Sequence, residues 1–346
     1  MRLLILTQKV DKNDAVLGFF HNWLKALSFK FENIMVIALS VGDYDLPNNV
    51  KVFSLGKEKK QSRCQYIIRL YKYIWQERKN YDAVFVHMNV EYILVAAWLW
   101  KLLGKKITLW YNHKHGSFKL YLSNFFVNKI FHTSPFACPA RFKKSITMPV
   151  GIDTDLFKRD SEDKIIKPTL LSIGRISPVK NIDILIEAME VLDKQKFDFL
   201  LNIYGDAPDR DKKYLDKLKT TATNLVNKKK IIFHSPIANS ETPAVYSRHN
   251  LFINLTDSGS FDKTILESMS CQNLVLICNQ SLGDDLPEQF LFEENNIQDL
   301  VEKIKQILSL SDIEQKKYKE QFRQYVINNH SLNLLSDKIK INLENL

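Results

Sequence analysis

Arg175 and Lys180 are two cations that lie between a predicted strand and a predicted helix. Residues 169–173 (TLLSI) form a short apolar run with the length of a buried strand, and Gly174 gives a turn directly after it. Apolar residues then recur with helical spacing from position 182. The free N–H groups of a helix N-terminus, with two fixed cations beside them, suit a diphosphate. The alternative is an ordinary strand–loop–helix unit whose Arg and Lys are solvated.

A second strand–loop–helix pattern occupies residues 251–267 (LFINLTDSGSFDKTILE). Its loop is small and polar, so the backbone N–H groups around Ser260, Phe261 and Asp262 can approach a ligand. Glu267 lies roughly one to two turns into the helix that follows, where a carboxylate can accept hydrogen bonds from sugar hydroxyls. The presence of this second pattern therefore favours a binding role, and not a purely structural one, for the segment with Arg175 and Lys180.

The motifs and their order resemble the nucleotide-sugar half of the family 4 glycosyltransferases. Four segments carry the resemblance: GIDTDLF at 151–157, GRISPVKN at 174–181, FHSPIANSETPAVY at 233–246 and GSFDKTILESMS at 259–270. The resemblance is strong over residues 150–280 and weaker in the first half of the chain. It is specific because of the combination and order of the motifs, since no single one of them would be.

The resemblance implies roles for individual residues. Arg175 and Lys180 would hold the donor's diphosphate, which carries developing negative charge as it departs. Glu267 would hold the ribose of the nucleotide. The remaining donor-binding positions that the resemblance implies are Gly18, Ile237, Ser260, Phe261 and Asp262.

Histidines at strand ends are the candidates for sugar and acceptor contacts. The resemblance implies that His113 positions the donor sugar near its anomeric centre, with His115 as the alternative. His87 also ends a predicted strand and is a candidate for the acceptor side. Each of the three also fits an ordinary loop histidine.

Position 259 departs from the family pattern. The family's first motif glutamate lies eight positions before the second, and here that position is Gly259. The first glutamate normally contacts the donor sugar, so the identity of the sugar is left open, and activity is put in question as well. Asp257 or Ser258 could supply the missing contact.

Strand and helix patterns alternate along the whole chain, which predicts α/β architecture with parallel, doubly wound sheets. The resemblance implies the GT-B fold, in which two Rossmann-like domains face each other across a cleft. The polar segment 150–168 marks the junction. We predict an acceptor-side domain at 1–165 and a nucleotide-sugar-binding domain at 166–324, with a final helix at 325–346 that packs back on the first domain. The predicted strands cover 3–7, 34–39, 51–55, 83–87 and 107–111, then 169–174, 198–204, 230–234, 251–255 and 274–278.

Positive charge is concentrated in the first half of the chain. Residues 46–152 hold 18 Lys and Arg against 4 Asp and Glu, whereas the net charge of the whole chain is +10. Within this region, 57–79 and 118–144 mix basic with aromatic residues, which suits the surface of an anionic membrane. The alternative, equally open at this point, is that the apolar residues are core and the charges are solvated. No recognition motif indicates nucleic acid.

Other features narrow the class of protein. The four cysteines form no CxxC pair, and the apolar run at 92–100 is shorter than a bilayer span. We predict a cytoplasmic enzyme, or one at the inner face of the membrane, with no metal and no cofactor besides its donor substrate. It would transfer a sugar with retention from a nucleoside-diphosphate sugar to a hydroxyl of a glycan or lipid-linked acceptor, in cell-surface glycan or glycolipid synthesis. The alternatives are a non-catalytic nucleotide-sugar-binding or partner subunit, which Gly259 favours, and a GT-B epimerase.

Overall fold

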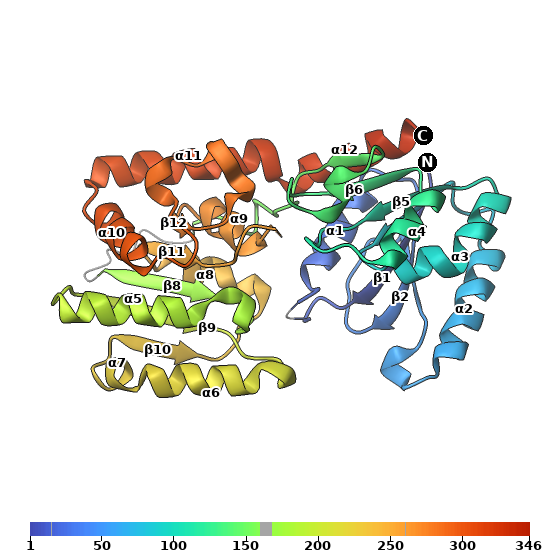
Figure 1. Cartoon of the computed structure of the whole chain (residues 1–346). Helices are drawn as coiled ribbons and strands as arrows, with labels where there is room; N and C mark the ends of the chain where they lie inside the picture. Colours follow the sequence, from blue (N-terminus) through green and yellow to red (C-terminus); the bar gives the residue numbers. More distant parts are fainter. Residues whose placement is uncertain (15, 160–167, 260) are drawn as a thin grey trace. The chain divides into compact units, whose positions relative to one another are not determined.

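The computed structural model describes residues 1–14, 16–159, 168–259 and 261–346. The described residues divide into two compact units, drawn in Figure 1. Unit 1 comprises Met1–Gly151 and Ser331–Leu346, and unit 2 comprises Ile152–His330. The chain therefore enters unit 2 earlier, and leaves it later, than the expected boundaries at 165/166 and 324/325.

A parallel sheet forms the centre of unit 1. In the part that the structure describes it has seven strands, in the order β3-β2-β1-β4-β5-β6-β7. The strands are β1 (Leu3–Val10), β2 (Ile34–Val41), β3 (Val50–Ser54), β4 (Ala83–His87), β5 (Lys106–Trp110), β6 (Lys129–His132) and β7 (Ser145–Thr147). The α-helices are α1 (Phe19–Ser28), α2 (Arg63–Gln76), α3 (Val90–Leu102), α4 (Phe118–Phe126) and α12 (Leu332–Glu344).

Alternate residues of each strand in unit 1 face different helices, as the two-residue period of a strand requires. Leu3 and Ile5 of β1 join the apolar cluster made with α1 and α12. Leu4 and Leu6 join the cluster made with α2, α3 and α4. Both faces of the sheet are thus covered, which explains why β1 is buried almost throughout.

A second parallel sheet forms the centre of unit 2. Among its described residues the strand order is β10-β9-β8-β11-β12. The strands are β8 (Thr169–Ile173), β9 (Leu200–Tyr204), β10 (Ile231–His234), β11 (Leu251–Asn254) and β12 (Leu274–Ile277). The α-helices are α5 (Ile182–Lys194), α6 (Lys212–Thr221), α7 (Thr223–Asn227), α8 (Thr242–Ser247), α9 (Lys263–Ser270), α10 (Ile297–Leu308) and α11 (Asp312–His330).

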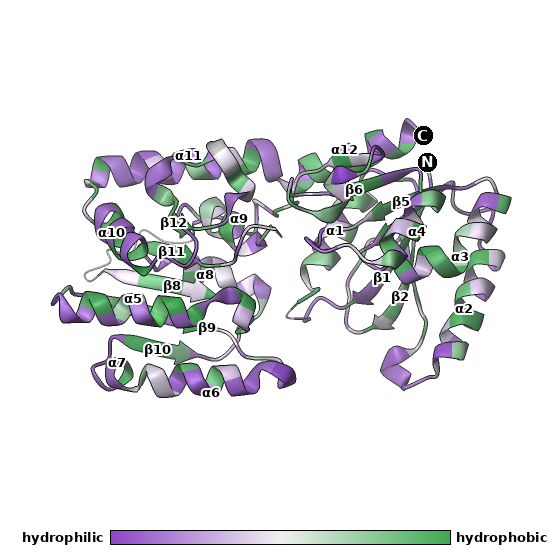
Figure 2. Ribbon diagram, in the orientation of Figure 1, coloured by the Kyte–Doolittle hydropathy of each residue, from purple (hydrophilic) through white to green (hydrophobic). Residues whose placement is uncertain are grey.

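The helices of unit 2 form two groups, with α5 contacting α6 and α10, and α9 contacting α8 and α11. Figure 2 shows mostly hydrophilic colouring along α11 and mostly hydrophobic colouring along α3 of unit 1. No helix within the described ranges is long and apolar enough to cross a membrane.

Two element predictions were wrong in detail. The apolar pattern at 117–131 predicts one helix, but α4 ends at Phe126 and β6 begins at Lys129. The final helical segment is also broken, because the Ser331 side chain accepts a hydrogen bond from Leu334 N at 3.4 Å and so caps a separate helix, α12. The break at Ser331 is where the chain returns to unit 1.

Candidate active site

The candidate site of unit 2 lies at the carboxyl ends of β8 and β11, where the strand order reverses. These strands pair with each other, and the connections from them run outward in opposite directions across the sheet. In open parallel sheets a ligand binds outside the carboxyl ends of the strands at such a switch point. The two strand–loop–helix segments, one with Arg175 and Lys180 and the other with Glu267, therefore meet at one edge of one sheet.

Two glycines hold the loop after β8 against the loop after β9. Gly174 N donates to Tyr204 O at 3.0 Å, and Ile176 N donates to Asp206 O at 3.0 Å. Gly205 has a φ of 147°, and a Cβ there would lie 1.9 Å from Gly174 O. Only glycine fits this contact. The position of the loop that carries Arg175 is thereby fixed by the backbone.

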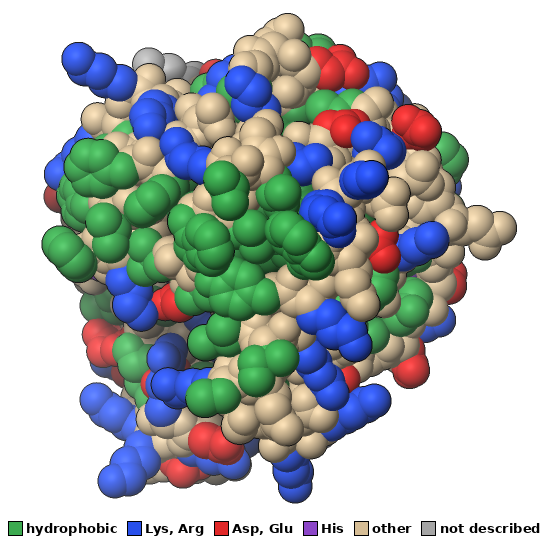
Figure 3. Space-filling model, turned by 90° about the vertical axis from the view of Figure 1, so that its right-hand side faces the viewer, with side chains coloured by type: hydrophobic (Ala, Val, Ile, Leu, Met, Phe, Trp, Pro, Cys, Tyr) green, Lys and Arg blue, Asp and Glu red, His purple; other side chains and the backbone are tan. Residues whose placement is uncertain are grey.

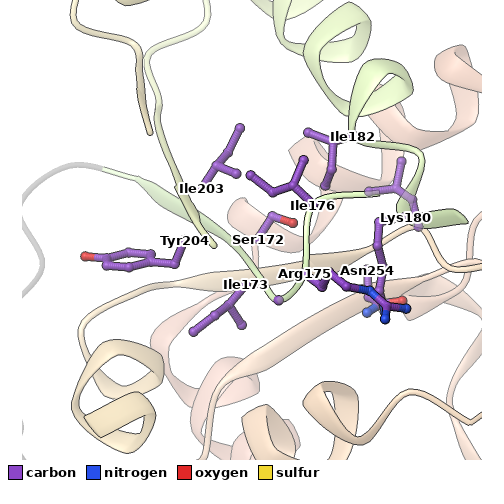
Figure 4. A pocket seen from close by; sticks show the side chains of 11 residues that line it. Ser172, Ile173, Arg175, Ile176, Lys180, Ile182, Ile203, Tyr204 and Asn254 are labelled. Carbon is purple, nitrogen blue, oxygen red and sulfur yellow. The ribbon is translucent and has the colours of Figure 1, made fainter. Parts of the chain in front are cut away.

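Arg175 and Lys180 line the same small pocket, shown in Figure 4. Their side chains gather on one side of this pocket with Asn254, while Tyr204 lies on the other side. Arg175 is exposed and makes no ion pair with any residue that the structure describes. Its guanidinium therefore remains available to an anionic ligand.

Lys180 is held in place by Asp262, which caps the N-terminus of α9. The Lys180 ammonium donates to Asp262 Oδ2 and, at 3.2 Å, to Thr256 Oγ1. Asn254 Nδ2 also donates to Asp262 Oδ2, at 2.7 Å. The other oxygen, Asp262 Oδ1, accepts from Thr264 N at 3.3 Å.

Charge fixes the ionisation of this cluster. Burial alone would raise the pKa of the Asp262 carboxyl. The Lys180 ammonium and the hydrogen bonds from Asn254 and Thr264 outweigh burial and hold that pKa well below its usual range. Asp262 is therefore ionised at neutral pH and keeps a cation at the N-terminus of a helix, where an anion is bound most readily.

Asn181 ties the two loops of the switch point together. Its φ is 49°, a left-handed conformation that asparagine tolerates better than most residues. Asn181 Nδ2 donates to Leu255 O at 2.9 Å and to Asp257 Oδ1 at 3.0 Å. Asp257, considered above as a substitute for the missing glutamate, is thus already engaged by Asn181.

Glu267 lies in α9 with only 5% of its surface exposed. Tyr246 Oη donates to Glu267 Oε2 at 3.3 Å, and Asn239 Nδ2 approaches Glu267 Oε1 at 3.5 Å. Burial raises the pKa of the Glu267 carboxyl, and the charge of Lys263 opposes that rise. Burial likewise lowers the pKa of Lys263, against the charge of Glu267. The segment 233–246 thus supplies two of the polar groups that contact this carboxylate.

The backbone at Gly259 has a conformation that favours glycine, so this loop differs by more than the loss of a glutamate side chain. Its φ of 145° is one that residues with a Cβ rarely adopt. Next to it, Ser258 N donates to Glu294 Oε1 at 2.8 Å, so a carboxylate does reach this loop, from a different part of the chain. Phe261 is nearly buried, with its ring 5.7 Å from that of His330. Ser260, predicted to bind donor, lies outside the described residues.

Ile237 is half-buried in the loop that follows β10. Beside that strand, at the carboxyl edge of the sheet, the rings of Tyr204 and His234 stack at 4.1 Å with an interplanar angle of 6°. His234 Nε2 lies 2.7 Å from Asn202 Oδ1. Ile237, predicted to bind donor, therefore follows a well-anchored strand end.

A larger cavity, of about 630 Å³, lies in unit 1 at the ends of β1, β4 and β5. His113 lines it from the loop after β5, and burial lowers the pKa of the imidazole. Met88, at the rim, has a φ of 65°, which is a strained conformation for methionine. The other lining residues are Gln8, Asn89, Val90, Glu91, Tyr111, Ser117, Phe118 and Lys119.

His87 and Gly18 are engaged within unit 1. His87 is 3% exposed, and its ring stacks on that of Phe20 with a centroid distance of 4.2 Å. It is not among the residues that line the cavity, and its place on the acceptor side stays a prediction. Gly18 caps α1, and a Cβ there would lie 2.5 Å from Asp14 O. The close approach of backbone to backbone explains the glycine without a ligand.

Comparison with known proteins identifies the class. The family model described as glycosyl transferases group 1 matches residues 153–326, half of the chain, and the chain belongs to this family. Membership of this family agrees with the resemblance to glycosyltransferases. The predicted fold class of two parallel-sheet, Rossmann-like α/β units is also confirmed, since solved structures of the GT-B class match it along the whole chain.

The individual relatives either match only part of the chain or share little of its sequence. Alpha-monoglucosyldiacylglycerol synthase of Streptococcus pneumoniae (strain ATCC BAA-255 / R6) is 37% identical over 102 residues. This match covers 30% of the chain and 22% of that protein, so the chain spans about a fifth of the length of its curated relative. HepE of Anabaena, solved in complex with UDP and glucose, superposes with a TM-score of 0.79 at 17% identity over 100% of both chains. A glycosyltransferase from Rickettsia africae ESF-5 gives 0.80 at 20% identity, covering 99% and 98%.

Proposed function

We propose that this glycosyltransferase moves a sugar from a nucleoside-diphosphate sugar to a hydroxyl acceptor, with retention at the anomeric carbon. One observation carries the donor class: Arg175 and an Asp262-anchored Lys180 lie together at the helix N-terminus of the switch point. Cations fixed there stabilise a departing diphosphate more than they stabilise the intact donor. HepE was solved with UDP, which makes UDP-glucose the first donor to test.

In the proposed reaction the acceptor oxygen bonds to the anomeric carbon as the bond from that carbon to the diphosphate breaks. The acceptor proton passes to the departing phosphate oxygen, so no side-chain nucleophile, metal or further cofactor takes part in the scheme. Glu267 accepts hydrogen bonds from the ribose. The resemblance assigns the positioning of the sugar to His113. The activity of a His113→Ala variant tests this assignment separately from the roles of Arg175, Lys180 and Glu267.

We propose a lipid-linked or glycan acceptor, used in cell-surface glycan or glycolipid synthesis at the inner face of the membrane. The cavity beside His113 supports this, because its lining offers Gln8, Asn89 and Glu91 to hydroxyls and Tyr111 and Phe118 to apolar groups. The name of the Streptococcus relative, a synthase of a glucosylated diacylglycerol, supports the same class.

A panel of nucleotide sugars tests the proposal through thermal unfolding of the whole chain. A donor that binds only the folded state at ~100 times its Kd adds ~2.7 kcal/mol of stability. No shift with any nucleotide sugar or free nucleoside diphosphate would overturn the donor assignment. Gly259 favours a second candidate, a binding subunit without turnover. Product formation from the winning donor separates the two, since only an enzyme releases free nucleoside diphosphate.

A further inference from the structure

The face of unit 1 formed by α2, α3 and α4 carries apolar side chains that do not enter the core. On α2, Leu70 and Ile74 point inward, whereas Ile68 and Trp75 are exposed at the spacing of two helical turns. The apolar residues that pack α2 into the core are thus different from the apolar residues that it exposes. The exposed apolar side chains of this face are Ile67, Ile68, Trp75, Trp98, Leu102, Phe118, Tyr121, Leu122 and Phe125.

Helix α3 is apolar on both sides, which a helix at an ordinary water-exposed surface is not. Its inner side, with Ile93, Ala97 and Trp100, packs in the core. Its outer side presents Trp98 and, one turn on, Leu102, which is 75% exposed.

Side-chain contacts join the exposed parts of the three helices into one face. Trp98 Nε1 donates to Tyr71 Oη of α2 at 3.0 Å. Lys119 of α4 pairs with Glu91 of α3 at 2.8 Å. Figure 3 looks toward this side of unit 1 and shows a broad hydrophobic area bordered by Lys and Arg. Contiguous apolar surface of this kind marks an interaction site.

The sequence segments that contain the helices of this face are strongly positive. Residues 63–106 and 117–144 hold 13 Lys and Arg against 3 Asp and Glu. Two of those acids are already paired, Asp82 with Arg2 and Glu91 with Lys119. An approaching surface therefore meets cations with few acids to offset them.

We propose that this face docks the enzyme on the surface of an anionic lipid bilayer. Aromatic and aliphatic side chains on basic helices enter the boundary between head groups and acyl chains, while Lys and Arg contact anionic head groups. A symmetric contact between two copies would bring the same positive face against itself, so charge disfavours self-association. Lipid head groups supply the opposite charge that this face lacks.

Docking would also place the acceptor cavity beside the lipid. Phe118 and Lys119 at the start of α4 belong both to the docking face and to the lining of the cavity. This step rests on the proposed lipid-linked acceptor, whereas docking itself requires neither donor nor acceptor. A failure of docking is thus distinguishable from a failure of the donor assignment.

Vesicle co-sedimentation of the full chain, without donor, tests the proposal. The protein is expected to sediment with phosphatidylglycerol-rich vesicles at low salt, and less as salt rises. Leu102→Ser combined with Phe125→Ser should weaken binding at least about tenfold, because both side chains are mostly exposed and outside the core. The matched control is Phe29→Ser with Ile313→Ser, which removes apolar surface of 83% and 82% exposure elsewhere and should leave binding unchanged.

Charge variants separate the electrostatic part. Lys72, Lys101 and Lys143, changed together to Gln, should reduce binding at low salt at least about tenfold. The same change at Lys213, Lys217 and Lys219 of α6 should not. Equal binding by the wild type and the Leu102→Ser, Phe125→Ser variant, or no binding to anionic vesicles at low salt, would overturn the proposal. So would a wild-type dimer that this variant converts to a monomer, since the face would then be a self-association surface. Unchanged melting temperatures establish that the variants are folded.

Discussion

Removal of Lys180 should affect both activity and stability, whereas removal of Arg175 should affect activity alone. Arg175→Ala and Lys180→Ala should each lower kcat/KM with the donor. The loss should correspond to about 3 kcal/mol of activation free energy, the effect of removing one electrostatic group. Lys180→Ala leaves the buried Asp262 carboxylate without its cation, so it should also lose about 2 kcal/mol of stability. Arg175→Ala should keep wild-type stability, because its side chain is exposed.

Steady-state kinetics and denaturant unfolding measure the two effects separately. The control is Lys180→Ala with Asp262→Asn, which removes both charges and should recover part of the stability without recovering activity. Near wild-type kcat/KM in either single variant would contradict the phosphate role.

Glu267→Gln should weaken binding of the sugar nucleotide and of the free nucleoside diphosphate by the same factor. A ribose contact exists in both ligands, so it cannot distinguish them. Calorimetric titration of both ligands checks this prediction. Loss of affinity for the sugar nucleotide alone would instead place Glu267 at the sugar.

Glu267 also predicts a pH dependence of stability. Its pKa in the folded chain is raised to about 7, from an ordinary 4.5. Between these values the folded chain holds a proton that the unfolded chain has released, so the free energy of unfolding falls as pH rises. The fall from pH 5 to 7 should be about 2 kcal/mol smaller in Glu267→Gln. Lys263 stays protonated in both states over most of this window, and denaturant unfolding at the two pH values measures the difference. Equal slopes in the two proteins would contradict the raised pKa.

At this scale the sequence could place residues but not their partners. Arg175, Lys180 and Glu267 could be located because each follows a recognisable strand or helix start. The contact between Lys180 and Asp262 joins residues 82 positions apart, and no spacing rule predicts it. Glu294, which reaches Ser258 across 36 positions, was missed for the same reason.

At the scale of elements, Gly205 fixes how the loops after β8 and β9 meet. Gly205→Ala should cost about 3 kcal/mol or more, because its Cβ would strike the Gly174 carbonyl and its φ is unfavourable for alanine. The matched control is Gly104→Ala, with a φ of 68° but no atom within 4 Å of the added Cβ. It should cost only about 1 kcal/mol. Urea unfolding compares them, and equal losses would show that the carbonyl contact is unimportant.

Strands that stand out as separate apolar runs could be predicted, whereas β6, which continues a helical pattern, could not. The buried strands from β1 to β5 and from β8 to β12 lie close to their predicted positions, since apolar runs bounded by turn residues specify them. The segment 117–131 continues a helical apolar pattern beyond α4. Asn128 ends it, because its N donates to Ile107 O at 2.8 Å and its Oδ1 accepts from Ile107 N at 2.9 Å. Pairing with β5 therefore overrides the local pattern.

At the scale of the whole molecule, α12 completes the core of unit 1. Ile339 is fully buried with α1 and the sheet, so Ile339→Ala should lower the free energy of unfolding by about 3 kcal/mol. Ile341, two positions along the same helix, is 54% exposed, and Ile341→Ala should change it by less than about 0.5 kcal/mol. Denaturant unfolding of both variants checks this. A similar loss in both variants would mean that α12 stabilises the fold through its helix propensity and not through the packing of Ile339.

The return of α12 to unit 1 also sets an order of events on the ribosome. Every residue of unit 2 is synthesised between the two segments of unit 1. Unit 2 can therefore fold while Phe20, Trp23 and Leu24 of α1 still await the helix that covers them. During that interval the nascent chain carries an open apolar surface, which is where a chaperone would bind and where aggregation would begin.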